Sequence, residues 1–399
     1  MRRPWVTVLI CGSLVIAVSM GLRQVSGLFL RPVAMDLGLS REGFGIAVAL
    51  QNLVWGLTQP FAGLLADRYG ARPVVIVGAL LYLAGMLVAA AAPDGIVFAL
   101  GLGLLGGLGQ SGTAFAVVLA VIGRAAPAEK RSAALGLGST ASSLGMFILV
   151  PATSALLDIM SWRMATVVLA GLLATIVLLA LPLREKGTRE AAGPSRFSAR
   201  GAAAEAASDR DFWLLNIGFA VCGFQLAFIA TYLPTILVDK GFPLSTGAAV
   251  LAAIGAFNIG GTYVAGLAGG RWMKTRVLAS LYIARSAAMI AFLLIPLSSA
   301  SAIAFGAVMG LLWTGTVPLT NGLVADLWGS RHLGFLFGIV YVGHQFGAFA
   351  GAWAAGFVFD RTGSFDAVWF AAIAAGIATA ILHLMLREEP RPLALAERA

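Results

Sequence analysis

Twelve apolar runs, each long enough to cross a lipid bilayer, follow one another along the 399-residue chain. A transmembrane helix needs about 20 mostly apolar residues. Only 11% of the residues are charged, whereas a soluble protein carries about 25%. The sequence therefore predicts an all-α membrane protein with twelve transmembrane helices in two six-helix bundles. The runs are 5–30, 43–66, 73–92, 96–123, 133–157, 164–183, 212–238, 245–269, 277–298, 301–325, 333–358 and 366–386.

The distribution of Lys and Arg predicts the orientation. An even number of helices places both termini on one side, and the segments on that side carry 20 Lys and Arg, against 5 in the segments on the other. Positive residues stay on the cytoplasmic side of a membrane. We therefore expect a multi-pass protein of the cytoplasmic (inner) membrane with both termini in the cytoplasm. The net charge of +9 is then a topology signal and calls for no nucleic-acid partner.

The apolar pattern is interrupted once by a long polar stretch at 184–211, rich in charge, Ala, Gly and Ser. We interpret it as a cytoplasmic linker between an N-terminal bundle at 1–183 and a C-terminal bundle at 212–399, which ends in a short tail. The halves repeat weakly at an offset of 203, as internal repeats of secondary transporters do. This offset aligns Gly63 with Gly266 and Arg68 with Arg271, but Asp67 with Gly270.

A short polar turn, Gly63-Leu64-Leu65-Ala66-Asp67-Arg68-Tyr69-Gly70-Ala71-Arg72, separates two of the apolar runs. It resembles the G-x-L-a-D-r-x-G-r-r signature of the major facilitator superfamily, which lies between that family's second and third helices. The resemblance implies transport by alternating access. It also implies a gating role for Asp67, Arg68, Arg72 and Arg124, with Asp67 close to Arg124 and to backbone amides near Arg331 when the cytoplasmic side is shut.

Three stretches, 21–29, 343–347 and 359–366, resemble the bacterial monocarboxylate and oxalate–formate branch of that superfamily. The branch resemblance implies a small organic anion as substrate. One departure matters: members of the branch often carry a carboxylate-binding arginine in helix 8, four residues before the loop glycine. Here that position is Thr262, ahead of Gly266, so the role cannot be transferred to it.

Two arginines, Arg23 and Arg285, lie inside apolar runs, whereas every acid falls in a loop or at a helix end. A charge inside the bilayer is costly and asks for a reason. Arg23 either extends toward the outer interface or attracts an anion at the mouth of a cavity. Arg285 either binds the anion or donates hydrogen bonds to backbone carbonyls of helices 8 and 11. We expect at least one of the two to bind the substrate.

Further polar side chains lie near the estimated midplane. Each could equally hold two helices together, but collectively they predict a polar site between the bundles. His344, well inside the membrane, is the candidate for a coupling proton, with a neutral structural histidine as the alternative. The expected substrate-binding residues besides the two arginines are Gln110, Gln225, Tyr232, Asn258, His344 and Gln345.

No enzyme motif, nucleotide-binding loop or metal-ligand spacing is present in the sequence, so we expect neither enzymatic activity nor a cofactor. The sequence thus favours a secondary transporter of a small organic anion, with a monocarboxylate as the preferred substrate. Proton symport is the preferred coupling, and anion exchange stays open. Two alternatives remain: an exporter of drugs or metabolites, and a non-transporting membrane sensor with the same fold. The expected partners are the anion, a co-transported proton and membrane lipid.

Overall fold

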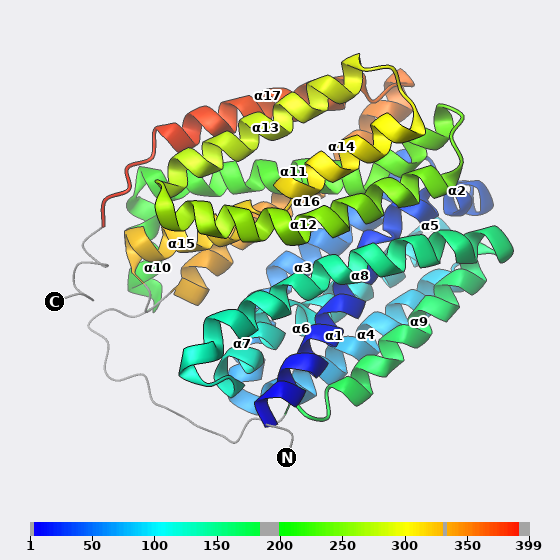
Figure 1. The fold of residues 1–399 in the computed structure, drawn as a ribbon. Coiled ribbons are helices and arrows are strands. Elements are labelled where there is room, and N and C mark those ends of the chain that lie inside the picture. The colour runs from blue at the N-terminus through cyan, green and yellow to red at the C-terminus, as the bar shows by residue number, and fades with distance from the viewer. Residues whose placement is uncertain (1–3, 184–198, 330–332, 391–399) are drawn as a thin grey trace.

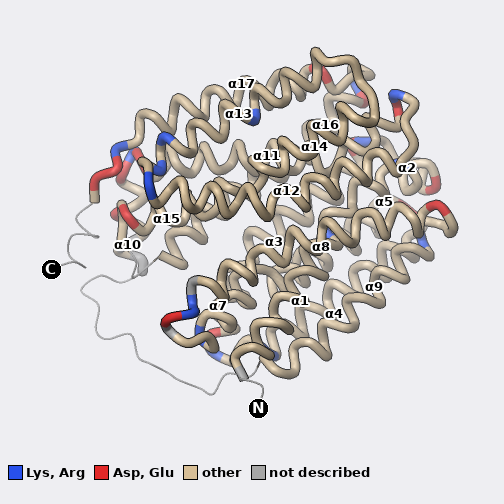
Figure 2. The backbone as a smooth tube through the Cα atoms, viewed as in Figure 1, with Lys and Arg blue, Asp and Glu red and all other residues tan. Residues whose placement is uncertain are grey.

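The computed structural model describes residues 4–183, 199–329 and 333–390, and every regular element in these ranges is a helix. Figure 1 shows two bundles side by side, the N-terminal one in blue to green and the C-terminal one in green to red. Ionisable residues gather at the two ends of the bundles, and Figure 2 shows the acids confined to these ends. This distribution fits a protein whose middle lies in hydrocarbon.

The N-terminal bundle contains six membrane-length segments, two of which are interrupted. The first segment is α1 followed by α2, and the fourth is α5, a π-helical turn η1, α6 and α7. The elements are α1 (Pro4–Gln24), α2 (Ser26–Leu37), α3 (Arg41–Tyr69), α4 (Ala71–Ala90), α5 (Gly95–Ala99), η1 (Leu100–Leu105), α6 (Gly106–Thr113), α7 (Phe115–Ala125), η2 (Ala128–Lys130, a 3₁₀ turn), α8 (Arg131–Ile159) and α9 (Trp162–Leu179).

The C-terminal bundle repeats this arrangement after a short helix, α10. Its fourth segment is also interrupted, between α14 and α15. The elements are α10 (Ala199–Ser208), α11 (Arg210–Asp239), α12 (Leu244–Arg271), α13 (Lys274–Leu294), α14 (Ser299–Leu312), α15 (Thr316–Trp328), α16 (Leu333–Thr362) and α17 (Asp366–Leu384). The expectation that 1–183 and 212–399 are separate structural units remains a prediction.

Eleven segments within the described ranges are long and apolar enough to cross a membrane. The twelfth segment of the predicted set is α3, whose 29 residues are also long enough to cross. It falls short in apolarity because it carries Gln51, Asn52 and Gln59 in its middle as well as charges at both ends. The predicted all-helical fold with about twelve spanning segments is thus confirmed, and the segment that falls short in apolarity carries three amide side chains in its interior.

Turn residues explain where several helices begin and end. Ser40, Asp94 and Ser161 precede α3, α5 and α9, and their side chains accept hydrogen bonds from Gly43 N, Ile96 N and Met164 N, respectively. Such N-caps satisfy amides that a helix leaves unpaired. Gly70 joins α3 to α4 with a φ of 86°, which glycine adopts without steric cost. The polar hairpin expected at 63–72 is therefore present.

Turns between the helices form the two ends of the molecule, the linker face and the far face. The linker face comprises the turns at 69–71 and 271–274, the end of α7 and helix α10. The far face comprises the turns at 37–41, 239–244 and 362–366. Helices α3 and α16 both extend from one face to the other, and they run in opposite directions.

The bundles touch along α3 and α16 near the far face and diverge toward the linker face. Gly45 of α3 packs against Ala352, and Gly56 packs against Gln345, so closely that a Cβ atom would clash at either glycine. Gly63 and Gly338 continue the same helix faces by one seven-residue step, yet a Cβ at either would have no neighbour within 4 Å. The interface therefore closes in its far half and opens in its linker half.

The second bundle interface, between α8 and α12, behaves in the same way. Gly255 packs against the backbone of Ser143 and Phe147. Gly136 lies seven residues before Ser143, and Gly266 lies eleven after Gly255, so both lie on the same helix faces, and a Cβ on either would have no neighbour within 4 Å. Two interfaces that open at the same end describe a transporter-like shape that is closed at the far face.

Candidate functional site

Arg23 lies at the end of α1, where the first segment is interrupted, and its guanidinium reaches α3. It donates to Asn52 Oδ1 and to Gln24 Oε1, the latter at 3.2 Å, and its Cζ lies 5.2 Å from the ring centroid of Trp55. These partners are neutral, and no carboxylate in the described part of the chain bonds to Arg23. The guanidinium therefore places a positive charge inside the membrane-spanning region that only neutral groups compensate in part.

A row of aromatic rings leads from Arg23 across the bundle interface. Trp55 meets Tyr341 of α16 edge to face, with centroids 5.7 Å apart, and Tyr341 stacks on His344 at 5.4 Å with an interplanar angle of 8°. His344 also lies 4.7 Å from the ring of Phe219 in α11. The structure thus brings Arg23 and His344, predicted separately from helices 1 and 11, to the two ends of one row of contacting rings.

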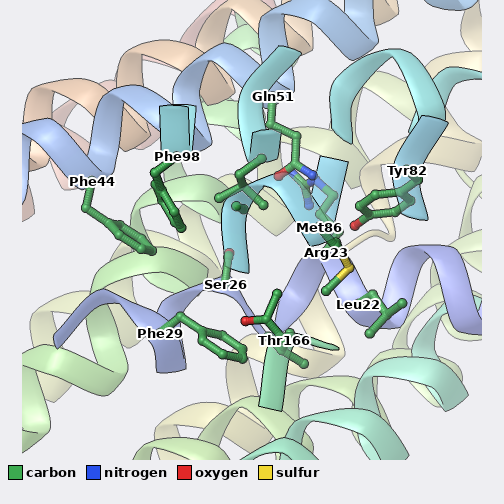
Figure 3. A pocket seen from close by; sticks show the side chains of 13 residues that line it. Leu22, Arg23, Ser26, Phe29, Phe44, Gln51, Tyr82, Met86, Phe98 and Thr166 are labelled. Carbon is green, nitrogen blue, oxygen red and sulfur yellow. The ribbon is translucent and has the colours of Figure 1, made fainter. Parts of the chain in front are cut away.

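A small cavity lies beside Arg23 within the N-terminal bundle. Its volume is about 40 Å³. Figure 3 shows Arg23, Gln51, Tyr82 and Met86 gathered on one side of it, while the ring of Phe98 lies on the other. The lining residues are Leu22, Arg23, Val25, Ser26, Phe29, Phe44, Gln51, Tyr82, Met86, Ala89, Phe98, Leu102 and Thr166.

Arg285 of α13 is fully buried and bonds to the interruption between α14 and α15. Its Nε and Nη2 donate to Leu312 O at 2.9 and 2.6 Å, and Nη2 also donates to Trp313 O at 2.5 Å. Nη1 donates to Cys222 Sγ at 3.3 Å and to Gln225 Oε1 at 3.4 Å. The sequence-based alternative named carbonyls of helices 8 and 11. The carbonyls belong instead to helix 10, because its break exposes them.

Asn258 of α12 satisfies the other side of this break. Its Oδ1 accepts from Thr314 N at 3.0 Å and from Thr314 Oγ1 at 2.8 Å, while its Nδ2 donates to Ser143 Oγ of α8 at 2.8 Å. Thr262, the position at which the helix-8 arginine is absent, donates to the same Oδ1 at 3.1 Å. Backbone groups freed inside a membrane must be paired within the protein. Asn258 does this and also ties the two bundles together.

The remaining predicted polar residues lie in different surroundings. Gln225 donates to Ala372 O at 2.9 Å, and Tyr232 donates to Ala352 O at 2.7 Å and to Arg41 O at 3.3 Å near the far face. Gln110 is fully buried, and neither polar atom of its side chain has a partner in the described part of the chain. Gln345 Nε2 is also unpartnered among the described residues, and its Oε1 lies 3.4 Å from His344 Nδ1.

A set of hydrogen bonds and ion pairs, the far-face latch, joins the bundles at their closed end. Arg41 of α3 pairs with Asp239 of α11 at 2.7 Å, and Glu42 pairs with Arg361 of α16 at 3.1 Å. Glu42 also accepts from Trp353 Nε1 at 3.0 Å. Asp360 accepts from the backbone N–H groups of Arg41 and Glu42 at 3.1 and 2.8 Å. Every one of these contacts runs between the N-terminal and C-terminal bundles.

At the linker face two ion pairs each lie within a single bundle. Asp67 pairs with Arg124 at 3.4 Å in the N-terminal bundle, and Lys274 pairs with Asp326 at 2.6 Å in the C-terminal one. The two pairs occupy equivalent places in the repeat, with the signs of the charges exchanged. Lys274 thus lies near the place that corresponds to Asp67, and Asp326 at the end of α15 lies near the place that corresponds to Arg124.

The other expected gating residues can be placed only in part. The guanidinium of Arg68 lies 5.2 Å from the ring of Tyr69, and Arg72 is half-buried at the start of α4. Arg331, near which Asp67 was expected to meet backbone amides, lies outside the described residues.

Comparison with known proteins decides the family. The pattern described as Major Facilitator Superfamily matches residues 12–318, which is more than half of the chain. The protein belongs to this superfamily. The resemblance carried by the 63–72 turn is therefore confirmed, and family and fold point to a multi-pass membrane transporter rather than to an enzyme.

Individual relatives of this superfamily member are distant. It is 27% identical over 376 residues to the uncharacterized MFS-type transporter YcxA of Bacillus subtilis, covering 90% of both chains. It is 30% identical over 365 residues to monocarboxylate transporter 11 of Homo sapiens, covering 88% of this chain and 76% of that one. The crystal structure of a D-xylose–proton symporter superposes with a TM-score of 0.73 at 15% identity, covering 97% and 99% of the two chains. That likeness concerns the fold alone.

Sequence reasoning missed three residues of α3, two of which, Gln51 and Trp55, lie beside Arg23. Gln51, Trp55 and Gln59 recur every four residues on one face of α3, and a polar atom of each is unpartnered among the described residues. That spacing inside an apolar run was the available signal. The partners in the far-face latch were not predicted, because Asp239 looks like an ordinary loop acid in the sequence and Asp360 was noted only as part of the 359–366 stretch.

Proposed function

We propose that this member of the Major Facilitator Superfamily is a secondary active transporter of a small organic anion, most simply a monocarboxylate. Arg23 would bind the carboxylate directly. The observation that carries the proposal is that the guanidinium of Arg23 is bonded to neutral groups and lies over Trp55, which contacts Tyr341 of the other bundle. The monocarboxylate transporters among the relatives support the same class of substrate.

The charge of Arg23 favours an anionic ligand on electrostatic grounds. A cation held in a low-dielectric interior is unfavourable unless an anion or strong dipoles compensate it. Amide oxygens and an aromatic face compensate Arg23 in part, and a carboxylate would complete the compensation through charge-assisted hydrogen bonds. A lipophilic cation would meet repulsion at the same place, since the acids lie at the two faces of the molecule (Figure 2).

Arg285 takes a supporting role in this proposal. Its donors bond to Leu312 O, Trp313 O, Cys222 and Gln225, so it stabilises the break in helix 10 and orients Gln225. Gln110, Gln345 and Asn258 would then form the polar surroundings of the transported anion, with Gln110 and Gln345 offering unpartnered atoms. Tyr232 would act at the far-face latch through its hydrogen bonds to Arg41 and Ala352.

The proton would be carried by His344. Its ring stacks on Tyr341, which contacts Trp55 beside Arg23, so this row of rings would couple protonation at His344 to anion binding at Arg23. Imidazole can take up a proton near neutral pH. Symport of one proton with one monovalent anion moves no net charge, which makes crossing of the hydrocarbon less costly.

Alternating access would close the two faces in turn. The far-face latch joins the bundles here, and the linker-face pairs lie within bundles. With the linker face in the cytoplasm, as the excess of Lys and Arg indicates, the structure corresponds to an inward-open state of a cytoplasmic-membrane protein. Rocking the bundles about Arg23 and His344 would exchange one closure for the other.

The direct test uses the purified full-length protein in liposomes loaded at pH 7.5 and diluted into buffer at pH 6. A panel of radiolabelled substrates would include small monocarboxylates, dicarboxylates, sugars and a lipophilic cation. We expect a monocarboxylate to accumulate and the imposed proton gradient to drive it. His344→Asn should abolish the gradient-driven accumulation while keeping carboxylate exchange at equal pH. Transport of the sugar or the cation alone would overturn the proposal.

A further inference from the structure

A hollow lies on the linker face at the turn between α12 and α13. Its volume is about 370 Å³. The α12–α13 hollow is lined by Arg271, Trp272, Met273, Arg276, Val277 and Ser280. No acid is among these lining residues, and none of them has a part in the transport proposed above. The hollow is therefore a candidate site for a separate ligand.

The turn that forms this hollow carries more positive charge than its counterpart in the N-terminal half. That counterpart has an acid where this turn has Gly270. Lys274 pairs with Asp326. Arg271 and Arg276 are both exposed, and neither guanidinium pairs with an acid in the described part of the chain. Figure 2 shows Lys and Arg at this end of α12 and α13. Two neighbouring cations thus remain available to a ligand.

Exposed apolar side chains continue from the hollow along both helices and form an apolar strip. Val264 and Leu267 are exposed on α12, seven and four residues before Arg271, so they share its face of the helix. Ile283 is exposed on α13, seven residues after the arginine of that helix that lines the hollow. Trp272 is 67% exposed at the turn itself, and tryptophan is enriched at the headgroup level of a membrane. The surface thus combines two cations at the helix ends with a strip that suits hydrocarbon.

We propose that the α12–α13 hollow binds an anionic phospholipid, with its phosphate between Arg271 and Arg276 and its acyl chains along the apolar strip. Guanidinium groups form paired, charge-assisted hydrogen bonds with phosphate oxygens, and basic pockets between membrane helices bind anionic headgroups. At about 10–15 Å³ for each water-sized group, the hollow has room for the roughly ten heavy atoms of a glycerophosphate. This site is independent of the transported substrate.

A lipid fits this surface better than a soluble phosphate does. Both ligands would use the two arginines, but only a lipid would also contact Trp272 and the apolar strip. The turn lies at the end of two membrane-length helices, which is the depth of phospholipid headgroups whichever face is cytoplasmic. Depth, charge and apolar surface therefore favour the same ligand.

The test is native mass spectrometry of the purified, delipidated full-length protein, which measures the affinity for the first lipid bound. Phosphatidylglycerol and phosphatidylcholine with identical acyl chains are compared. Each arginine close to an anionic lipid should tighten binding about fivefold, so phosphatidylglycerol should bind about twentyfold more tightly than phosphatidylcholine. Arg271→Gln combined with Arg276→Gln should reduce this preference to about twofold or less, and each single variant should reduce it about fivefold. Trp272→Ala should weaken both lipids and keep most of the preference.

The matched control combines Arg31→Gln with Lys240→Gln, which removes two exposed cations away from the linker face and should keep the preference. A preference that persists in the folded double variant of Arg271 and Arg276 overturns the proposal. An equal loss in the control, or no preference in the unaltered protein, overturns it as well. Binding of glycerol 1-phosphate as tight as that of phosphatidylglycerol would assign the hollow to a soluble phosphate instead. None of these measurements depends on transport, so the proposed function is tested separately.

Discussion

The guanidinium of Arg41 and the carboxylate of Asp239 lie 2.7 Å apart and join the two bundles at the far face. The chain separates these residues by nearly the whole of its N-terminal half and the linker. Two contacts of the next residue in α3 reinforce this connection: the Glu42 carboxylate pairs with Arg361, and the Glu42 N–H donates to Asp360 of α16. The state in which the protein is seen therefore depends on a few contacts whose loss should be measurable.

Asp360→Ala should shift the protein toward states that are open at the far face. The carboxylate accepts two backbone hydrogen bonds across the bundles, and losing charge-assisted bonds of this kind costs about 2 kcal/mol, or roughly thirtyfold in the equilibrium. Spin labels at Ile96 and Lys240, one on each bundle, would report a longer distance. Asp158→Ala removes an exposed carboxylate at the same face and should change nothing. An unaltered distance distribution in the Asp360 variant would refute the latch.

Arg285→Met should destabilise the protein by about 3 kcal/mol because the carbonyls of Leu312 and Trp313 lose their donors inside the membrane region. Thermal unfolding in detergent measures the effect. Arg276→Met, at an exposed position of the same helix, is the control. Arg285→Lys should restore only part of the stability, because an ammonium lacks the planar fork. Wild-type stability in the Met variant would mean that the break in helix 10 does not need this residue.

Asp67→Asn should slow transport at least severalfold while leaving substrate affinity within about twofold. The Asp67–Arg124 pair is solvent-exposed and contributes little to stability. Its loss should therefore change the rate at which the protein converts between the states open at either face. Turnover in liposomes and equilibrium binding in detergent separate the two effects. Glu129→Gln, an exposed acid on the same face, serves as control. A large loss of affinity with normal turnover would place Asp67 in the binding site instead.

The topology is tested by cysteine labelling in a background that carries Cys11→Ala and Cys222→Ser. Ser208→Cys, in α10 at the linker face, should resist an impermeant maleimide in intact cells and react after the membrane is opened. Lys240→Cys, at the far face, should react in intact cells. The reverse pattern would place the linker face outside and invert the proposed direction of opening.

Much of the fold was predictable because membrane helices are identified by length and apolarity alone. The 63–72 turn also predicted the family, since Asp67, Gly70 and the neighbouring arginines occur in a fixed spacing. The sites of interruption were harder, because Trp313-Thr314-Gly315 contains no proline and its break depends on Arg285 and Asn258 from other helices. The exchange of charge between Asp67–Arg124 and Lys274–Asp326 could not be predicted, because the weak repeat aligns Asp67 with Gly270 and gives no hint of Asp326.

The site itself was predictable only as a set of embedded polar residues. Arg23 and His344 were identified from the rarity of such groups in apolar runs. Their connection through Trp55 and Tyr341 depends on how α3 and α16 pack, which single-helix periodicity does not specify. Gln51 was overlooked because one amide in a long helix is usually an interhelical contact.

The central claim is that Arg23 binds the carboxylate of the substrate, and calorimetry on Arg23→Gln tests it most directly. We expect the affinity for the best-bound monocarboxylate to fall by on the order of a hundredfold or more, since losing one partner of a buried charge pair costs about 3–5 kcal/mol. Arg23→Lys should recover part of it, and Arg31→Gln, on an exposed turn of α2, should have no effect. A folded Arg23→Gln protein that binds the same anion with near-normal affinity would contradict the account.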